Sequence, residues 1–280
     1  MYILETKLIE KYREWLRQME KSAGTAKKYV RDILALYAYL PEDKQLSWEV
    51  MQGWKSHLLE RQLSIGTINT ILTAVTGFFR FLGWIELLMR QFRRQRKIFR
   101  DTERELSREE YIRLVQTAER LGKNRLSLVM QSICATGIRI SELRYLTVEA
   151  VKQGRAEVNC KGKVRVVLIP SELKRRLLCW IRQEKIASGP IFITKKGRPL
   201  DRSNVWHEMK KLCEKADVAG KKVFPHNLRH LFAVTFYRKQ KDLAKLADIL
   251  GHSSVETTRI YAMESGEEHR KMLNQLRLIL

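Results

Sequence analysis

The segment PHNLRH, residues 225–230, combines residue types that could act on a phosphate. Pro225 favours the start of a helix, and His226 and Arg229, three residues apart, then share one face of its first turn. Backbone amides at a helix start attract an anion, so this pair suits a phosphate group. Taken alone, a core histidine beside a surface arginine explains the pattern equally well. His230 falls on another face and is expected to be structural.

A second such segment is LGHSSVETTRIYA, residues 250–262. Gly251 is typical of a helix end, and His252 follows it directly. Either of the next two serines can cap a helix that carries Tyr261. Taken alone, a tyrosine nine residues after a histidine would be interpreted as a core residue.

The third segment, ATGIRISEL, covers residues 135–143. Gly137 can end one helix and Ser141 can cap the next, which places Arg139 on a tight connection. Alone, Arg139 would be interpreted as a surface residue. Glu142 lies near it in sequence and is expected to be its partner rather than a metal ligand.

The fourth segment is a lysine-containing turn, Lys161-Gly162-Lys163. It lies between residues 156–160 and 164–169. These flanking residues either alternate between apolar and polar types or form a run of β-branched residues, so the pattern predicts a β-hairpin. Residues 190–200 predict a third short strand with a glycine turn. Lysines at a β-turn are usually only solvated, so this signal is weak by itself.

Together and in this order, the four segments resemble the signature boxes of the tyrosine recombinases, also called phage integrases, and especially their small Xer-like members. The boxes fit over residues 107–265, and the resemblance extends to nearly the whole chain. It implies the following catalytic residues: Arg139, Lys161, His226, Arg229, His252 and Tyr261. Small members often carry GKGNK at the hairpin, whereas here Cys160 replaces the first glycine and the turn is one residue shorter. Lys161 is therefore preferred as the catalytic lysine, and Lys163 remains an alternative.

The resemblance also implies a mechanism. A covalent nucleophile preserves the energy of a broken phosphodiester for rejoining, and Tyr261 would take that role, deprotonated with help from His226. Arg139 and Arg229 would hold the non-bridging oxygens, and His252 would hydrogen-bond the same phosphate. The hairpin lysine would protonate the leaving 5′-oxygen. The product would be a 3′-phosphotyrosyl intermediate, formed without metal, ATP or another cofactor.

The organisation of the chain predicts a mainly α fold with a small antiparallel sheet. Residues 1–89 show only helical periodicity and predict a core-binding domain of four or five short helices. Residues 90–106 predict an inter-domain linker, since six of the eleven residues from 90 to 100 are basic. Residues 107–280 predict an α+β catalytic domain that ends in an exchange helix.

Several helix starts are marked by capping residues. Thr25 and Ser47 can cap the second and third helices, and Ser64 or Thr67 can cap the fourth. A glutamate three residues after Ser107 completes a capping box, which marks the start of the second domain.

The charge balance indicates a polyanionic partner. The chain has 54 Lys and Arg against 31 Asp and Glu, a formal net charge of +23. Lysine and arginine gain affinity for nucleic acid by releasing condensed counterions, so double-stranded DNA is the expected partner. The four cysteines are scattered and predict reduced thiols in a cytoplasmic protein. The apolar stretch from residue 72 to 89 contains charges and predicts a buried helix rather than a membrane span.

The C-terminal residues 267–280 predict a short helix with an apolar side. The resemblance implies that this helix docks on a neighbouring protomer and assembles a homotetramer on the recombination site; packing on its own domain is the alternative. Two other functions are alternatives to recombination. A type IB topoisomerase relaxes DNA with a similar residue set, and a DNA-binding regulator could carry an inactive site.

Overall fold

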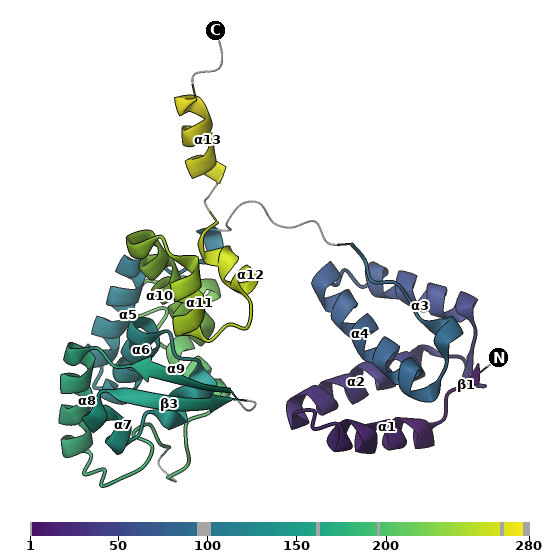
Figure 1. The fold of residues 1–280 in the computed structure, drawn as a ribbon, viewed down its shortest axis with the longest axis horizontal. Helices are drawn as coiled ribbons and strands as arrows, with labels where there is room; N and C mark the ends of the chain where they lie inside the picture. The colour runs from purple at the N-terminus through teal and green to yellow at the C-terminus, as the bar shows by residue number, and fades with distance from the viewer. Residues whose placement is uncertain (1, 94–101, 161–162, 195–196, 264–265, 277–280) are drawn as a thin grey trace. The chain divides into compact units, whose positions relative to one another are not determined.

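The computed structural model describes residues 2–93, 102–160, 163–194, 197–263 and 266–276. The chain forms two compact units, Met1–Arg96 and Lys97–Leu280 (Figure 1). Each unit has its own hydrophobic core. The structure is mainly helical with small antiparallel sheets, so the predicted fold class is confirmed.

The first unit is built mainly from helices. They are α1 (Thr6–Gln18), α2 (Ala23–Tyr39), α3 (Trp48–Glu60), α4 (Ile65–Leu82) and the 3-10 helix η1 (Ile85–Leu87). Buried residues recur three or four positions apart on each α-helix, for example Met51, Trp54 and Leu58 on α3, because that spacing keeps them on one face. The unit also contains a short antiparallel pairing of β1 (Tyr2–Ile3) with β2 (Gln45–Leu46) that the helical periodicity did not predict.

The predicted helix caps can be compared one by one. Ser47 caps α3 and Ser64 caps α4, each accepting a backbone N–H three residues later, as predicted. The prediction for Thr25 was wrong, because Ser22 caps α2 and Thr25 lies in its first turn, where its N–H bonds to the Ser22 hydroxyl. The helix begins three residues earlier than predicted, so the N–H of Thr25 is itself one of the amides that need a cap.

Helix α4 is long and apolar enough to cross a membrane by length and composition alone. One such helix is weak evidence for a span, and its buried side chains, among them Ile68, Leu72 and Phe78, belong to the core of the first unit. The interpretation of this region as a core helix agrees with that packing.

The start of the basic run is fixed to the first unit. Lys55 on α3 donates to the carbonyl of Arg90 at 2.8 Å and lies 4.2 Å from the centre of the Phe92 ring. The side-chain amide of Asn69 on α4 brackets the backbone of Phe92, donating to its carbonyl and accepting from its N–H, both at 2.9 Å. Residues 94–101 of the predicted linker lie outside the described residues.

The second unit combines helices with one β-hairpin, whose second strand leaves Val164, Val166 and Leu168 exposed (Figure 1). Its elements are η2 (Thr102–Arg104), α5 (Arg108–Arg120), α6 (Asn124–Thr136), η3 (Ile140–Tyr145), α7 (Val148–Gln153), β3 (Arg155–Cys160), β4 (Lys163–Leu168), α8 (Ser171–Gln183), α9 (Arg202–Lys210), η4 (Gly220–Lys222), α10 (Pro225–Gln240), α11 (Leu243–Leu250), α12 (Val255–Thr258), η5 (Arg259–Tyr261) and α13 (Gly266–Gln275). The capping box at Ser107 is present at the start of α5, and Pro225 occupies the first turn of α10, both as predicted.

The β-hairpin follows the prediction, but the third strand does not. β3 and β4 pair antiparallel, with Cys160 opposite Lys163 at the turn. Among the described residues of the 190–200 stretch, only isolated bridges form, Thr147 with Pro190 and Ile193 with Pro199. Prolines at both bridges lack an N–H for a continuous ladder, which explains why no strand develops there.

Candidate active site

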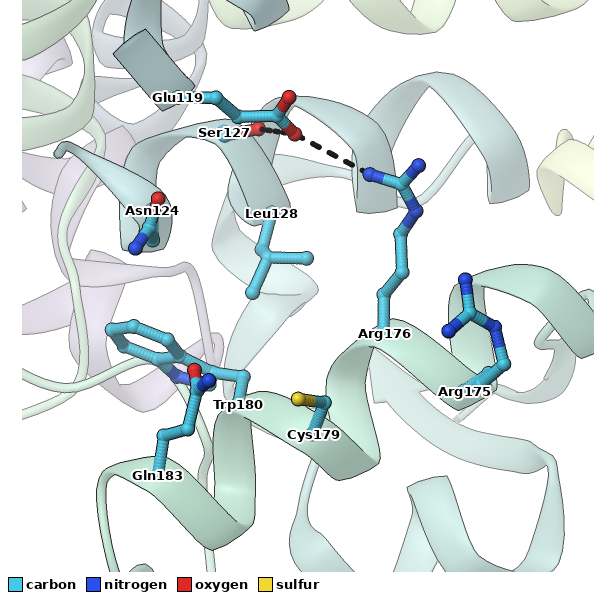
Figure 2. A pocket seen from close by; sticks show the side chains of 9 residues that line it. All are labelled: Glu119, Asn124, Ser127, Leu128, Arg175, Arg176, Cys179, Trp180 and Gln183. Atoms are coloured by element: carbon cyan, nitrogen blue, oxygen red, sulfur yellow. Dashed lines mark hydrogen bonds and ion pairs between the residues drawn. The ribbon is translucent and has the colours of Figure 1, made fainter. Parts of the chain in front are cut away.

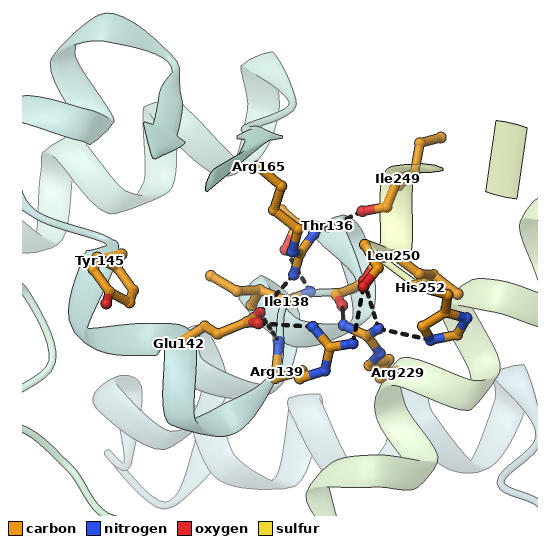
Figure 3. A network of polar contacts seen from close by, with 12 residues as sticks. Thr136, Ile138, Arg139, Glu142, Tyr145, Arg165, Arg229, Ile249, Leu250 and His252 are labelled. Atoms are coloured by element: carbon orange, nitrogen blue, oxygen red, sulfur yellow. Dashed lines mark hydrogen bonds and ion pairs between the residues drawn. The ribbon is translucent and has the colours of Figure 1, made fainter. Parts of the chain in front are cut away.

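Four segments of the second unit meet at one site: the ends of α6 and α11, the start of α10, and strand β4 (Figure 3). The two helix ends are closed by glycines in the left-handed conformation, Gly137 with φ +65° and Gly251 with φ +62°. Each turn exposes backbone carbonyls toward the same place, because the last carbonyls of a helix have no partner within it. Three arginines use those carbonyls.

Arg139 is the more accessible of the two predicted arginines, with 38 % of its side chain exposed. Its Nη1 donates to Glu142 Oε1 at 2.8 Å, and its backbone N–H donates to Glu142 Oε2 at 2.9 Å. Glu142 is therefore the partner of Arg139, as predicted. Ser141 is not a cap, contrary to prediction, because η3 begins one residue earlier and Glu142 already satisfies the N–H at its start.

Arg165 on β4 belongs to the site, and the sequence reasoning missed it. Its Nη2 lies 2.5 Å from Glu142 Oε2, and its Nη1 donates to the carbonyl of Ile249 at 2.7 Å. A signal was present, since Arg165 shares its strand face with the buried Val167 and Ile169. The period-2 alternation of a strand thus predicts an inward-pointing arginine, which needs a buried partner.

The buried Glu142 is the counter-charge of both arginines. It is 2 % exposed. Burial raises the pKa of its carboxyl, but the hydrogen bonds from Arg139 and the positive charge of Arg165 outweigh that effect and hold the pKa below its usual value. Glu142 is therefore ionised at neutral pH and aligns the two guanidinium groups.

Arg229 on α10 is almost fully buried, at 3 % exposure. Its Nη1 donates to the carbonyl of Gly137 at 2.5 Å and its Nη2 to the carbonyl of Leu250 at 2.8 Å. Burial, together with the charges of Arg139 and Arg165, lowers the pKa of Arg229 to about 10. The group stays charged at neutral pH, and its two carbonyl contacts tie the ends of α6 and α11 together.

His252 lies next to Arg229 and uses both of its ring nitrogens within the protein. Its Nε2 is 3.1 Å from Arg229 Nη2, and its Nδ1 is 2.9 Å from the hydroxyl of Thr258. A guanidinium only donates, so Nε2 accepts from Arg229 and Nδ1–H donates to Thr258. Burial and the charge of Arg229 lower the pKa of His252 to about 4, which keeps the ring neutral.

Tyr261 ends the short helix η5 and is 2 % exposed. Ser254 caps the helix before it, in agreement with one of the two predicted serines. The Tyr261 ring lies nearly parallel to the His252 ring at a centroid distance of 6.3 Å. Burial raises the pKa of the Tyr261 hydroxyl, while the charge of Arg229 acts in the opposite direction. The hydroxyl is therefore protonated at neutral pH and needs a base to react.

His226 and the lysine are less closely defined. His226 lies on the first turn of α10, one turn before Arg229, and is exposed. Partial desolvation and the positive charge of Arg229 lower its pKa, so it is neutral at pH 7 and able to accept a proton. Lys161 lies outside the described residues, between strands β3 and β4. The choice between Lys161 and Lys163 therefore stays a prediction.

A separate hollow of about 400 Å³ lies between α5, α6 and α8 (Figure 2). Glu119 and Arg176 form an ion pair at its rim, 3.3 Å apart, and the buried Trp180 Nε1 beside it has no hydrogen-bond partner among the described residues. None of the predicted site residues lines this hollow. The hollow is thus separate from the candidate active site, where Arg139 is partly exposed and Arg229 and Tyr261 are buried.

Comparison with known proteins gives the family. The model described as "Phage integrase family" matches residues 104–268, and "Phage integrase, N-terminal SAM-like domain" matches residues 9–85. Tyrosine recombinase XerA of Thermococcus kodakarensis is 28 % identical over 279 residues, covering 97 % of this chain and 96 % of the relative. Because the first match spans more than half of the chain, the protein belongs to the phage integrase family, the tyrosine recombinases.

Solved structures agree on the fold. A lambda integrase dimer bound to a COC′ core site, solved for residues 75–356, has a TM-score of 0.74 at 18 % identity, covering 94 % of this chain and 96 % of that one. A lambda integrase tetramer bound to a Holliday junction has a TM-score of 0.72 at 18 % identity, covering 91 % of this chain and 76 % of that one. The predicted family and the prediction of a tyrosine-type site-specific recombinase are confirmed.

Proposed function

We propose that this site-specific DNA recombinase cuts and rejoins DNA with Tyr261 through a 3′-phosphotyrosyl intermediate. The observation that carries the proposal is the convergence of Arg139, Arg229 and His252 on the two glycine-closed helix ends, with the Tyr261 ring packed beside His252. Arg139 and the carbonyl of Gly251 that it contacts lie 112 residues apart in the sequence. Their concentration of positive charge suits the pentacoordinate phosphorus of strand transfer.

The two arginines differ in what they offer a phosphate. The side chain of Arg139 is partly exposed, and its Nε takes no part in the contacts with Glu142 and Gly251, so Arg139 would contact the non-bridging oxygens first. Arg229 is held by backbone carbonyls, so it would act mainly by placing positive charge beside the phosphate and the Tyr261 hydroxyl. His252 would give up its contact with Arg229 and take the other tautomer, so that Nε2–H donates to the same phosphate while Nδ1 accepts from the Thr258 hydroxyl.

Proton transfer would use neutral groups near the phosphate. His226, with its lowered pKa, would take the Tyr261 proton as the hydroxyl attacks phosphorus. The bond from phosphorus to the 5′-oxygen then breaks, and the lysine of the β3–β4 turn, Lys161 or Lys163, would protonate that oxygen. Attack of a 5′-hydroxyl from a second duplex on the phosphotyrosine reverses these steps. The arginines and the lysine supply the charge that metal ions supply in other nucleases.

We further propose that the two units act together on duplex DNA. The first unit, with the helices of residues 1–89, would bind one side, residues 90–106 would cross the duplex, and residues 107–280 would bind the other side and cut. The exposed apolar residues Met272 and Leu273 of α13 and Leu276 just after it, with exposures of 48, 64 and 57 %, suit docking on a neighbouring protomer within a homotetramer. We place this activity in the cytoplasm, where such DNA sites occur.

The experiment that tests the nucleophile is covalent trapping. The full chain is incubated with a pool of random-sequence duplexes, each nicked near its centre, so that cleavage releases a short 5′-hydroxyl strand and prevents rejoining. Wild-type protein is expected to form a protein–DNA adduct that survives denaturing gel electrophoresis. Tyr261→Phe is expected to bind the same duplexes without forming an adduct. An adduct with this variant would show that Tyr261 is not the nucleophile.

A further inference from the structure

Arg104 and Glu105, in the segment that leads into the second unit, are attached to helix α10, which also carries Arg229. The side-chain amide of Asn227 donates to the carbonyl of Arg104 at 2.6 Å, and it is itself 6 % exposed. One turn later on α10, Nε2 of His230 lies 3.1 Å from Glu105 Oε1. Two adjacent turns of one helix therefore hold successive residues of this segment. Asn227 fixes the backbone of Arg104, and His230 fixes the side chain of Glu105.

The Glu105–His230 contact is sheltered from water. The two side chains are 18 and 16 % exposed. A neighbouring ion pair on the same segment, between Glu103 and Lys221, is longer at 3.8 Å and its side chains are 82 and 60 % exposed. Sheltered polar contacts fix side-chain geometry more strongly than exposed pairs do, because solvent competes less for the same groups.

His230 also contacts Tyr261. The two rings are tilted at 57° to each other, with centroids 5.1 Å apart, a distance at which aromatic rings are in contact. Tyr261 lies in a three-residue 3-10 helix after a helix of four residues, so few backbone hydrogen bonds fix its orientation. Packing against α10 must therefore set the direction of the Tyr261 ring.

We propose that Glu105 and His230 form a positioning pair that holds the ring of Tyr261 and links its placement to the segment that enters the second unit. Glu105 fixes the orientation of the His230 ring, and the His230 ring fixes that of Tyr261. Neither residue touches the reacting atoms. Glu105 lies near the end of the predicted linker of residues 90–106, so a displacement of that linker on DNA reaches the nucleophile through two contacts, that of Glu105 with His230 and that of His230 with Tyr261. The effect on catalysis rests on the proposed role of Tyr261, whereas the effect on ring placement does not.

The first test needs no DNA. Tetranitromethane nitrates accessible tyrosines, and mass spectrometry of the full chain measures the nitrated fraction of each one. Glu105→Ala is expected to raise nitration of Tyr261 severalfold, while Glu105→Gln, which keeps the hydrogen bond, stays near wild type. Glu103→Ala is the matched control and is expected to change nothing. Nitration of Tyr111, in the same unit, reports general loosening and is expected to stay constant.

The second variant separates the two contacts of His230. His230→Phe keeps a ring against Tyr261 but loses the bond to Glu105, so it is expected to behave like Glu105→Ala. The double variant is expected to be no worse than either single one, since both remove the same link. Additive effects, equal nitration in Glu105→Ala and wild type, or a parallel rise at Tyr111 would each overturn the proposal.

Cleavage provides the readout for function. With the nicked duplex pool, Glu105→Ala is expected to form the covalent adduct about tenfold more slowly at unchanged DNA affinity, because a small misplacement of a reacting group has a large effect on rate. Rescue by Glu105→Gln is expected. If wild-type protein forms no adduct, the proposed function fails while the nitration result stands. Equal adduct rates in wild type and Glu105→Ala would overturn the link to catalysis.

Discussion

Arg165 and Glu142 form a 2.5 Å ion pair between strand β4 and helix η3, and Glu142 simultaneously holds Arg139. The glutamate is 3 % exposed at its side chain, whereas Arg139 is partly open to solvent. One buried carboxylate thus sets the direction of a partly accessible arginine and fixes the middle of strand β4, in the hairpin whose turn carries the candidate lysine.

Glu142→Gln is expected to destabilise the second unit by about 3 kcal/mol, because it leaves two guanidinium groups without their buried counter-charge. Urea unfolding of the full chain measures this. Glu172→Gln is the matched control: Glu172 also pairs with two arginines, Arg175 and Arg176, but on the surface. No measurable change is expected for the control, and equal effects of the two variants would contradict the role given to Glu142.

Gly251→Ala is expected to damage the site more than its backbone conformation alone explains. A Cβ at this position would overlap the side chain of Arg165, and the left-handed φ of +62° adds its own strain. We expect a loss of about 3 kcal/mol or more, from strain and overpacking together, with slower DNA cleavage as Arg165 moves.

Gly189→Ala isolates the backbone contribution. Gly189 has a φ of +75°, and a Cβ there would meet no atom within 4 Å. This variant is expected to lose only about 1 kcal/mol. If thermal unfolding gives the same loss for both variants, the contact of Gly251 with Arg165 is unimportant.

The stability of the second unit is expected to fall as the pH drops below about 6.5. The pKa of His252 is lowered to about 4 in the folded protein. Below its ordinary pKa the unfolded chain takes up a proton that the folded site rejects, so the loss grows until the pH reaches the folded pKa. Between pH 6.5 and 5 this amounts to about 1 kcal/mol, since His252 is only half-buried and solvent screens part of the effect, and His226, whose pKa is also lowered, adds in the same direction. His252→Gln is expected to flatten the profile, measured by urea unfolding across this range; an unchanged slope would argue against the buried neutral histidine.

Leu273→Glu on α13 is expected to prevent assembly on DNA without preventing DNA binding by single protomers, since a charge on an apolar docking face is costly to bury. Analytical ultracentrifugation with the trapped duplexes measures the assembly state. Asn274→Glu adds the same charge at the adjacent exposed position and serves as the control. Assembly by both variants to the wild-type extent would show that α13 does not dock through this face.

The sequence by itself determined the features that depend on neighbouring residues. The capping box at Ser107, the helix start at Pro225, the hairpin and the glycine-closed helix ends all follow from local hydrogen bonding and backbone preference. The order of four short motifs was enough to indicate the family. Local reasoning failed where the helix begins earlier than the predicted cap, which leaves Thr25 and Ser141 inside their helices.

Only the tertiary structure decided how the site is held together. The contacts of Arg229 with Gly137, of Arg165 with Ile249 and of His230 with Glu105 join residues 92, 84 and 125 positions apart. Such contacts depend on which helix ends and strand faces meet after folding, and no local pattern encodes that choice. Burial then decides the chemistry, because the same histidine or tyrosine has a different pKa once water is excluded and a guanidinium lies beside it.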